Sequence, residues 1–118
     1  MHPVSKSTKK AYRWGSGGIG WPLVETKGQL MVEETLAPGC SEKHHYRNQA
    51  AQCFYMLVGR AAMQFADAQS VKIDTGMALH IPPEICHAIV NKTGEAIRFL
   101  VISAPSLRGD RHEVEREK

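Results

Sequence analysis

The chain has 118 residues, of which 42% are hydrophobic and 23% are charged, and its formal net charge at pH 7 is +3. This length suits one domain with its own core and is too short for two, and so mild a charge excludes the concentrated basic surface of a typical nucleic-acid-binding protein. Three cysteines without a CxxC spacing exclude a disulfide scaffold and a structural zinc knuckle, and they favour a reducing compartment.

The first part of the chain lacks the features of a targeting or membrane segment. No apolar stretch follows the early lysines, and no apolar run approaches the roughly 18 residues of a membrane helix. We therefore expect a cytoplasmic protein that binds neither membranes nor nucleic acid.

Short strands separated by turn residues dominate the predicted secondary structure. Residues 1–21 are rich in Ser, Lys and Gly, which predicts an irregular N-terminal arm. The predicted strands are 23–26, 29–36, 53–58, 61–65, 71–73, 78–81, 87–90 and 97–103. Regular turn signals between such strands indicate an all-β sandwich or barrel over residues 22–104. Residues 105–118 are mostly charged and predict a C-terminal tail outside it.

Two sets of residues recur at spacings that resemble the cupin superfamily, and in particular its small single-domain, mannose-6-phosphate-isomerase-like members. The first set is Gly39, His45, Arg47, Gln52 and Gly59, and the second is Gly76, Pro82, His87 and Asn91. They follow the family patterns G-x5-H-x-H-x3–4-E-x6-G and G-x5-P-x-G-x2-H-x3-N, except that Arg47 replaces a His, Gln52 a Glu and Glu84 a Gly. The resemblance implies an antiparallel double-stranded β-helix, that is, a jelly-roll cupin barrel.

The alternation of side chains along a strand predicts which residues enter the barrel. Residues two apart share one face of a strand, and a barrel brings such inward sets together from distant positions. By the same alternation, His44 is expected to face solvent, unless a bulge turns it inward in place of Arg47. The predicted site residues are His45, Arg47, Gln52, Phe54, Met56 and His87. Polar side chains that converge in an apolar cavity are the usual form of a small-molecule site.

The altered motif positions bear on metal binding. The resemblance implies a divalent Zn, Ni, Fe or Mn ion, and the residues here that can ligate one are His45, Gln52 and His87. Arg47 cannot ligate, because its guanidinium stays protonated and has no free lone pair, and its charge repels a dication. The sequence also places no carboxylate at the fourth ligand position. We therefore expect any metal to be weakly bound, and otherwise no cofactor.

Three functions stay open at this point. An isomerase or epimerase would bind a sugar or another polar anionic substrate through Arg47, Gln52, Phe54 and Met56. His45 and His87 would then act as general acid and base. The alternatives are a metal-dependent, dioxygenase-like cupin with an altered ligand set, and a non-catalytic barrel that binds or senses a small molecule.

The resemblance also bears on assembly. Small cupins commonly pair through their N-terminal strands, and the N-terminal arm carries Tyr12, Trp14 and Trp21. We therefore expect a homodimer in which this arm takes part.

Substitution of Arg47 by His tests the predicted site. Arg47→His is expected to restore three imidazoles and to raise affinity for zinc or nickel by about tenfold or more, while weakening anion binding. Calorimetric titration of both proteins with each metal measures the change. Tight metal binding by the native protein that the substitution leaves unchanged would show that Arg47 does not face the site.

Overall fold

The computed structural model describes residues 1–67, 69–106 and 109–114. The chain begins with a 3-10 turn, η1 (Lys6–Thr8), and otherwise consists of strands joined by turns. The strands are β1 (Tyr12–Trp14), β2 (Gly18–Glu25), β3 (Leu30–Leu36), β4 (His45–Arg47), β5 (Ala51–Val58), β6 (Ala61–Phe65), β7 (Ser70–Ile73), β8 (Ala78–Ile81), β9 (His87–Val90), β10 (Ile97–Ala104) and β11 (Arg111–Glu113). In this part of the chain no helix has the length and apolar character needed to cross a bilayer.

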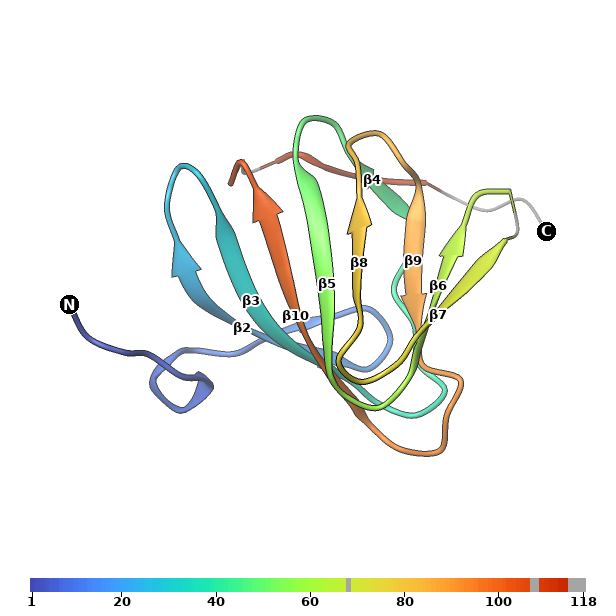
Figure 1. Ribbon diagram of the computed structural model, residues 1–118, viewed down its shortest axis with the longest axis horizontal. Helices are drawn as coiled ribbons and strands as arrows, with labels where there is room; N and C mark the ends of the chain where they lie inside the picture. The colour runs from blue at the N-terminus through green and yellow to red at the C-terminus, as the bar shows by residue number, and fades with distance from the viewer. Residues whose placement is uncertain (68, 107–108, 115–118) are drawn as a thin grey trace.

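The strands form two antiparallel sheets that face each other (Figure 1). One sheet has the order β1-β2-β3-β10-β5-β8, and the other has the order β11-β4-β9-β6-β7. Strands distant in sequence are neighbours in both sheets, as where β10 lies between β3 and β5. This arrangement is the all-β jelly-roll barrel that the sequence predicts.

The apolar core lies between the sheets. The burial of β10 alternates residue by residue, with Ile97, Phe99 and Val101 directed inward, as a half-buried strand requires. The full core cluster is Leu36, Phe54, Met56, Ala61, Met63, Ile73, Ile81, Ile89, Ile97, Phe99 and Val101. Burial of each large apolar side chain contributes about 1.5–3 kcal/mol. Further along the same inner face of β5 and β10, Gln52 pairs with Ser103, so the barrel interior becomes polar toward one end.

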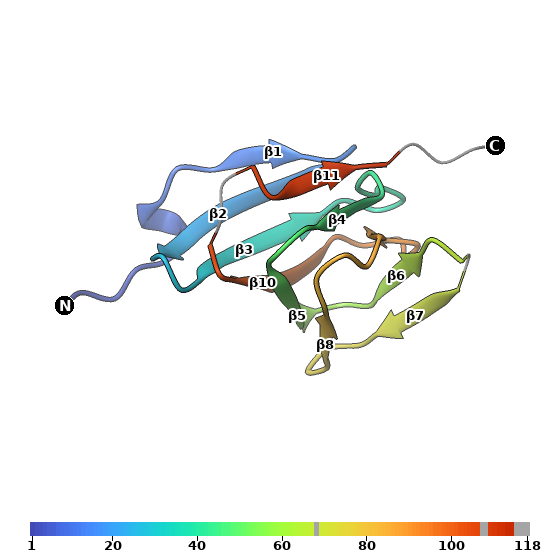
Figure 2. The same cartoon turned by 90° about the horizontal axis from the view of Figure 1, so that it is seen from above.

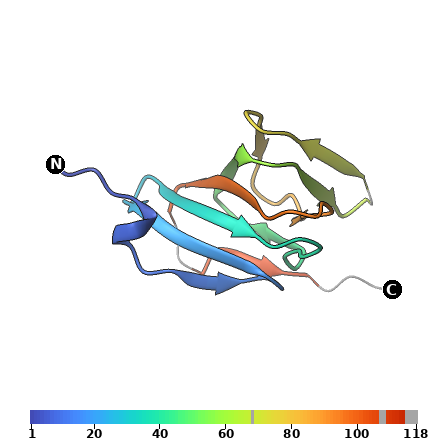
Figure 3. The same ribbon diagram turned by 90° about the horizontal axis from the view of Figure 1, so that it is seen from below.

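The N-terminal segment is more regular than its composition predicts. Strand β1 and the first half of β2 fall within the predicted arm at 1–21, and β1 and β2 extend the six-stranded sheet beyond β3 (Figure 3). Gly20 makes this possible, because a Cβ atom there would lie 2.6 Å from the Cζ atom of Tyr12. Gly18 allows the same approach by the ring of Trp14. Glycine normally weakens strands, so the run GSGGIG indicates a loop unless the aromatic rings that cover it are known.

The C-terminal segment also joins the barrel. Strand β11, drawn in red in Figure 2, pairs with β4. This pairing places Arg111 opposite Arg47 and Glu113 opposite His45. Of the predicted tail at 105–118, residues 107–108 and 115–118 lie outside the described residues. Asp110 fixes the start of β11, because its carboxylate accepts hydrogen bonds from three successive backbone N–H groups, those of residues 48 to 50, at 2.9–3.2 Å. Burial opposes ionisation of Asp110, but these bonds outweigh it and hold its pKa below the ordinary value.

One departure from the family motif carries backbone strain. Gly59 has a φ of +96°, and a Cβ atom there would lie 2.7 Å from the Ile97 side chain, so the position requires glycine. Glu84, which stands where the motif has glycine, also adopts a left-handed φ of +70°. Its N–H donates to the Arg47 carbonyl at 2.6 Å, which holds the turn in this conformation. For a residue with a side chain this conformation costs about 1–2 kcal/mol.

Substitution of Glu84 by Gly is expected to stabilise the fold by about 0.5–1 kcal/mol, because relief of strain exceeds the entropy that glycine adds to the unfolded chain. Urea unfolding followed by circular dichroism measures the change. Glu95→Gly is the matched control, since Glu95 is exposed and lacks a positive φ. This substitution should lower the stability of the fold by about 0.5–1 kcal/mol. Equal losses from both substitutions would contradict the assignment of strain to Glu84.

Candidate functional site

A cavity of about 300 Å³ lies at the polar end of the barrel. Its apolar walls include Leu30, Val32, Phe54 and Val101. Its polar lining includes Glu34, Glu42, His45, Arg47, Gln52 and Arg111. Apolar walls with a few convergent polar groups are typical of small-molecule sites.

The structure brings most of the residues predicted from the sequence to this cavity. His45, Arg47, Gln52 and Phe54 all line it, and His87 lies directly behind His45 with 4.4 Å between the ring centroids. Met56 shares the face of Gln52 and Phe54 but does not line the cavity. It is fully buried in the apolar core, where it is the register partner of Phe99.

The expectation that His44 faces solvent is wrong, because only 9% of this residue is exposed. Strand β4 begins at His45, so strand alternation does not extend back to His44. Its carbonyl accepts a hydrogen bond from the N–H of Val114, just after β11, which covers this segment.

Backbone carbonyl groups orient the two imidazoles of the site. His45 and His87 are direct cross-strand partners on β4 and β9, and each is 1% exposed. Nδ1 of His45 lies 3.1 Å from the Lys43 carbonyl oxygen, and Nδ1 of His87 lies 2.9 Å from that of Ile85. Since a carbonyl oxygen only accepts, Nδ1 of each neutral ring carries the hydrogen and Nε2 carries the lone pair.

Gln52 connects His87 to the opposite sheet. Its Oε1 lies 3.1 Å from Nε2 of His87, and its Nε2 donates to the Ser103 hydroxyl at 3.1 Å. With the hydrogen of His87 on Nδ1, two lone pairs face each other at this distance. A proton or a divalent cation between the two atoms relieves the repulsion. Rotation of the Gln52 amide also relieves it, because it turns the NH2 group toward His87.

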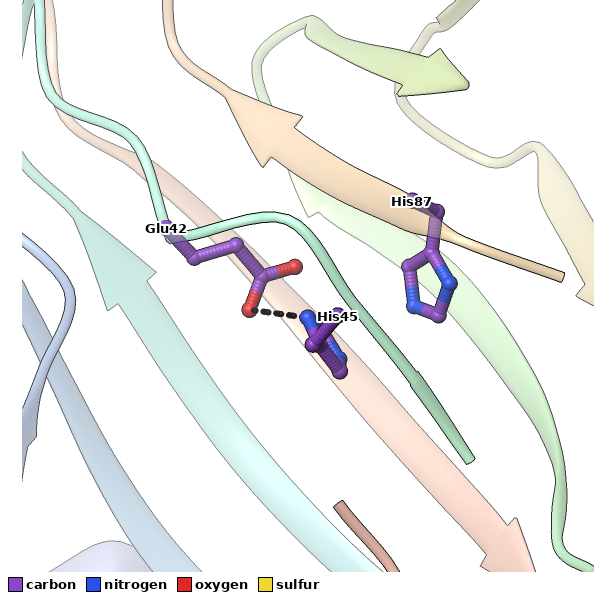
Figure 4. A group of neighbouring side chains, drawn as sticks. All are labelled: Glu42, His45 and His87. Carbon is purple, nitrogen blue, oxygen red and sulfur yellow. Dashed lines mark ion pairs between the residues drawn. The ribbon is translucent and has the colours of Figure 1, made fainter. Parts of the chain in front are cut away.

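The structure adds Glu42, which the sequence analysis missed. One ligand atom from each of Glu42, His45 and His87 lies within 4.8 Å of the others, and Figure 4 shows the carboxylate directed at His45, with Oε2 3.8 Å from Nδ1. Glu42 therefore supplies a carboxylate beside the imidazoles from outside the motif position that Gln52 occupies. Hydrogen bonds with the backbone N–H and carbonyl of Ile89 hold Glu42 against β9. Glu42 precedes β4 in a segment without strand periodicity, so alternation could not place it.

A second carboxyl group, Glu34, lies on the inner face of β3. The hydroxyl of Tyr12 donates to Glu34 Oε2 at 3.1 Å across Gly20, which lies between them in the sheet and has no side chain. Burial, followed by the nearby Glu42, raises the pKa of Glu34 from 4.5 to about 8. A signal was present in the sequence, because Glu34 is in phase with the apolar residues Val32 and Leu36.

The electrostatics of the cavity keep its imidazoles neutral. Burial, with Arg111 as the next largest cause, lowers the pKa of His45 from 6.5 to about 2. Burial also lowers the pKa of His87 to about 4. At neutral pH both rings are therefore unprotonated, whereas Glu34 is protonated. Burial raises the pKa of Glu42 to about 7, so this carboxyl titrates near neutral pH.

Comparison with known proteins identifies the family. The Cupin domain model matches residues 32–103, which is more than half of the chain, and the chain belongs to the cupin family. Among curated proteins, none matches the chain significantly.

Solved structures show the same fold. The polyketide cyclase RemF from Streptomyces resistomycificus is 21% identical with a TM-score of 0.85, covering 100% of this chain and 88% of its own. A protein with a double-stranded β-helix domain from Klebsiella pneumoniae is 17% identical with a TM-score of 0.82, covering 98% and 99%. A sugar phosphate isomerase of the cupin superfamily from Silicibacter pomeroyi is 16% identical with a TM-score of 0.77, covering 89% and 76%. Likenesses at these identities show the fold alone.

The raised pKa of Glu34 predicts that stability falls as pH rises. Folded Glu34 binds its proton more tightly than the unfolded chain does, so folding loses stability between pH 4.5 and about 8. The two imidazoles have the opposite effect, but only below pH 6.5, because their pKa values are lowered. Between pH 6.5 and 8 we expect metal-free protein to lose about 1 kcal/mol, seen as a falling melting temperature.

Glu34→Gln keeps the shape of the side chain without its titration. It should flatten most of this slope, leaving the contribution of Glu42 below about pH 7. An unchanged slope between pH 7 and 8 would show that Glu34 ionises normally in the folded protein.

Proposed function

We propose that this protein is an enzyme that transfers protons on a small, polar, anionic substrate, as in the isomerisation or epimerisation of a sugar. One observation carries the proposal. A single cavity holds a neutral imidazole, whose pKa is lowered, and a protonated carboxyl, whose pKa is raised. Pairs of groups whose environments push their pKa values apart are suited to act as base and acid at the same pH.

His45 is the base in this proposal. Its ring lines the cavity, and its Nδ1–H is held by the Lys43 carbonyl, which leaves the Nε2 lone pair to accept a proton. The base removes a proton from the carbon next to a substrate carbonyl group. Binding of a substrate anion offsets the positive charge of Arg111, which is one cause of the low pKa of His45. His87 packs against this base from the neighbouring strand, with 4.4 Å between the ring centroids.

Glu34 is the matching acid. Its Oε2 accepts the Tyr12 hydroxyl, which leaves Oε1 to carry the proton. The acid protonates the carbonyl oxygen as the base takes the carbon-bound proton, so a C–H bond breaks, an O–H bond forms and an enol results. Transfer of a proton from His45 to the former carbonyl carbon, with loss of the O–H proton of the hydroxyl on the neighbouring carbon, moves the carbonyl group and gives the isomer. Return of a proton to the opposite face of the first carbon, with return of the enol O–H proton to Glu34, gives the epimer. No oxidant or reductant is consumed.

The remaining lining residues suit substrate binding. Arg47 offers a planar fork to an anionic group, and Phe54 offers an apolar surface to the substrate carbon atoms. Gln52 supplies an amide that hydrogen-bonds neutral polar groups. The solved sugar phosphate isomerase of the cupin superfamily shares this fold, so the fold is compatible with a function of this kind.

The cluster of Glu42, His45 and His87 favours a metal-dependent enzyme as a second candidate. Two imidazoles with free Nε2 lone pairs and one carboxylate fit Zn, Ni, Fe or Mn, and the Gln52 amide oxygen facing His87 fits the same ion. A bound divalent ion would polarise a substrate oxygen. Arg47 and Arg111 oppose tight binding, because each places a positive charge near the donor atoms.

Deuterium exchange tests the proposed function. Protein freed of metal with EDTA is incubated in D2O with hexose 6-phosphates and hexuronates, and NMR detects deuterium at carbon or conversion to an isomer. His45→Gln is expected to lower the rate by at least about 100-fold, and Glu34→Gln by about 10- to 100-fold, because each removes one proton-transfer group. His80→Gln, an exposed histidine on β8, is the matched control and should keep the rate.

Two results would contradict acid–base catalysis by these residues. One is an absence of exchange on every compound of the panel. The other is exchange that EDTA abolishes and that a divalent metal restores, which would favour the second candidate. Elemental analysis of the purified protein then identifies the ion.

A further inference from the structure

We propose that Arg47 and Arg111 together form a binding site for a phosphate dianion, so that the substrate is a phosphorylated small molecule. The proposal rests on the proposed function, because it names the anionic group of that substrate. It adds a residue from the C-terminal strand to the site, at a position that neither cupin motif contains.

The two arginines are placed opposite each other by strand pairing. Arg47 ends β4, Arg111 begins β11, and they are register partners. Directly opposed residues of antiparallel strands direct their side chains to the same face, with Cβ atoms about 4.5–5.5 Å apart. Both side chains accordingly line the cavity that holds His45.

Arg47 carries a charge that the described residues do not neutralise. Within this part of the chain no carboxylate lies within ion-pair distance of Arg47, and its buried Nε has no hydrogen-bond partner. The nearby Asp110 uses both carboxylate oxygens on the backbone N–H groups that precede β5. A partly buried cation without a partner is unfavourable, and a bound anion supplies the missing hydrogen bonds.

Arg111 is held loosely enough to turn toward a ligand. Its two terminal nitrogens lie 3.5 Å from Glu42 Oε2 and 3.5 Å from Glu113 Oε2, which are long contacts for a charged pair. Glu113 is half-exposed, so water screens its pair with Arg111. An anion between the arginines can therefore replace these contacts with shorter ones.

The acidic residues of the cavity do not cancel this positive charge. Glu34 accepts the Tyr12 hydroxyl and is mostly protonated at pH 7, since its pKa is about 8. Oε1 of Glu42 accepts the Ile89 N–H, and its Oε2 lies 3.5 Å from Nη1 of Arg111, a long contact for a charged pair. The two arginines keep their charges throughout this range.

Two opposed guanidinium groups fit a phosphate better than a carboxylate. One guanidinium fork satisfies both oxygens of a carboxylate, whereas a phosphate monoester offers three terminal oxygens and a charge near −2. The cavity of about 300 Å³ leaves room beside the arginines for a small organic group next to His45.

Calorimetric titrations at pH 7.5 and low salt test the proposal. The probes are inorganic phosphate, D-glucose 6-phosphate, acetate and D-glucose. Both phosphates are expected to bind at least about tenfold more tightly than acetate, and glucose not measurably. Tighter binding of the ester than of inorganic phosphate supports a phosphorylated substrate. The reverse order overturns that assignment in favour of free phosphate as the ligand.

Single substitutions identify the residues. Arg47→Gln and Arg111→Gln should each weaken phosphate binding by about 10- to 100-fold, and Arg47→Lys by less. Arg13→Gln is the matched control, because Arg13 is exposed between Tyr12 and Trp14 on β1, and it should leave the affinity unchanged. Glu113→Gln removes a negative charge from the cavity wall and should tighten binding about two- to fivefold, a gain that misfolding cannot produce.

The outcomes separate this proposal from the proposed function. Loss of deuterium exchange in His45→Gln with intact phosphate affinity supports both. Phosphate binding by a protein that exchanges no substrate would leave the anion site standing and contradict the acid–base function. No phosphate binding, or equal affinity in the native, Arg47→Gln and Arg111→Gln proteins, overturns the anion site whatever the exchange experiment shows.

Discussion

The direct pairing of His45 with His87 across β4 and β9 is the constraint on which the rest of the site depends. It places two imidazoles side by side with their Nδ1 atoms turned to backbone carbonyls, so both rings direct their lone pairs away from the strands. Burial keeps the rings neutral, because no described carboxylate forms a short ion pair with either ring. Glu42 approaches them only because its own backbone and side chain are hydrogen-bonded to Ile89, two residues after His87 on the same strand.

The two ends of the chain complete the cavity that the central strands begin. Strand β1 brings Tyr12 to Glu34, and strand β11 brings Arg111 to Arg47. Each addition depends on one local feature. Gly20 leaves space for the Tyr12 ring, and Asp110 fixes the start of β11 against the turn before β5. The central barrel supplies the imidazoles together with Glu34, Glu42 and Arg47, and the terminal strands add Tyr12, Arg111 and Glu113 around them.

The charges within this cavity bear differently on proton transfer, anion binding and metal binding. Desolvation raises the pKa values of the carboxyl groups and lowers those of the imidazoles, so proton donors and acceptors coexist at neutral pH. The arginines attract anions and repel a dication. Glu42 nevertheless provides a carboxylate beside the imidazoles, whereas the motif position of Gln52 does not. The proposed acid–base catalysis and the proposed metal binding are therefore competing uses of the same residues, and the proposed anion site is compatible with both.

The sequence by itself determined the barrel and the central part of the site. The strands predicted at 61–65, 78–81 and 87–90 match β6, β8 and β9 residue for residue, and alternation placed His45, Gln52 and Phe54 on inner faces. These features follow from local periodicity and from motif spacing, which a single chain displays. Tertiary structure alone decided the positions of Tyr12, Glu42 and Arg111. Each reaches the cavity through a pairing or hydrogen bond with a distant residue, and neither glycine-rich nor charged composition reveals such a contact before the chain is folded.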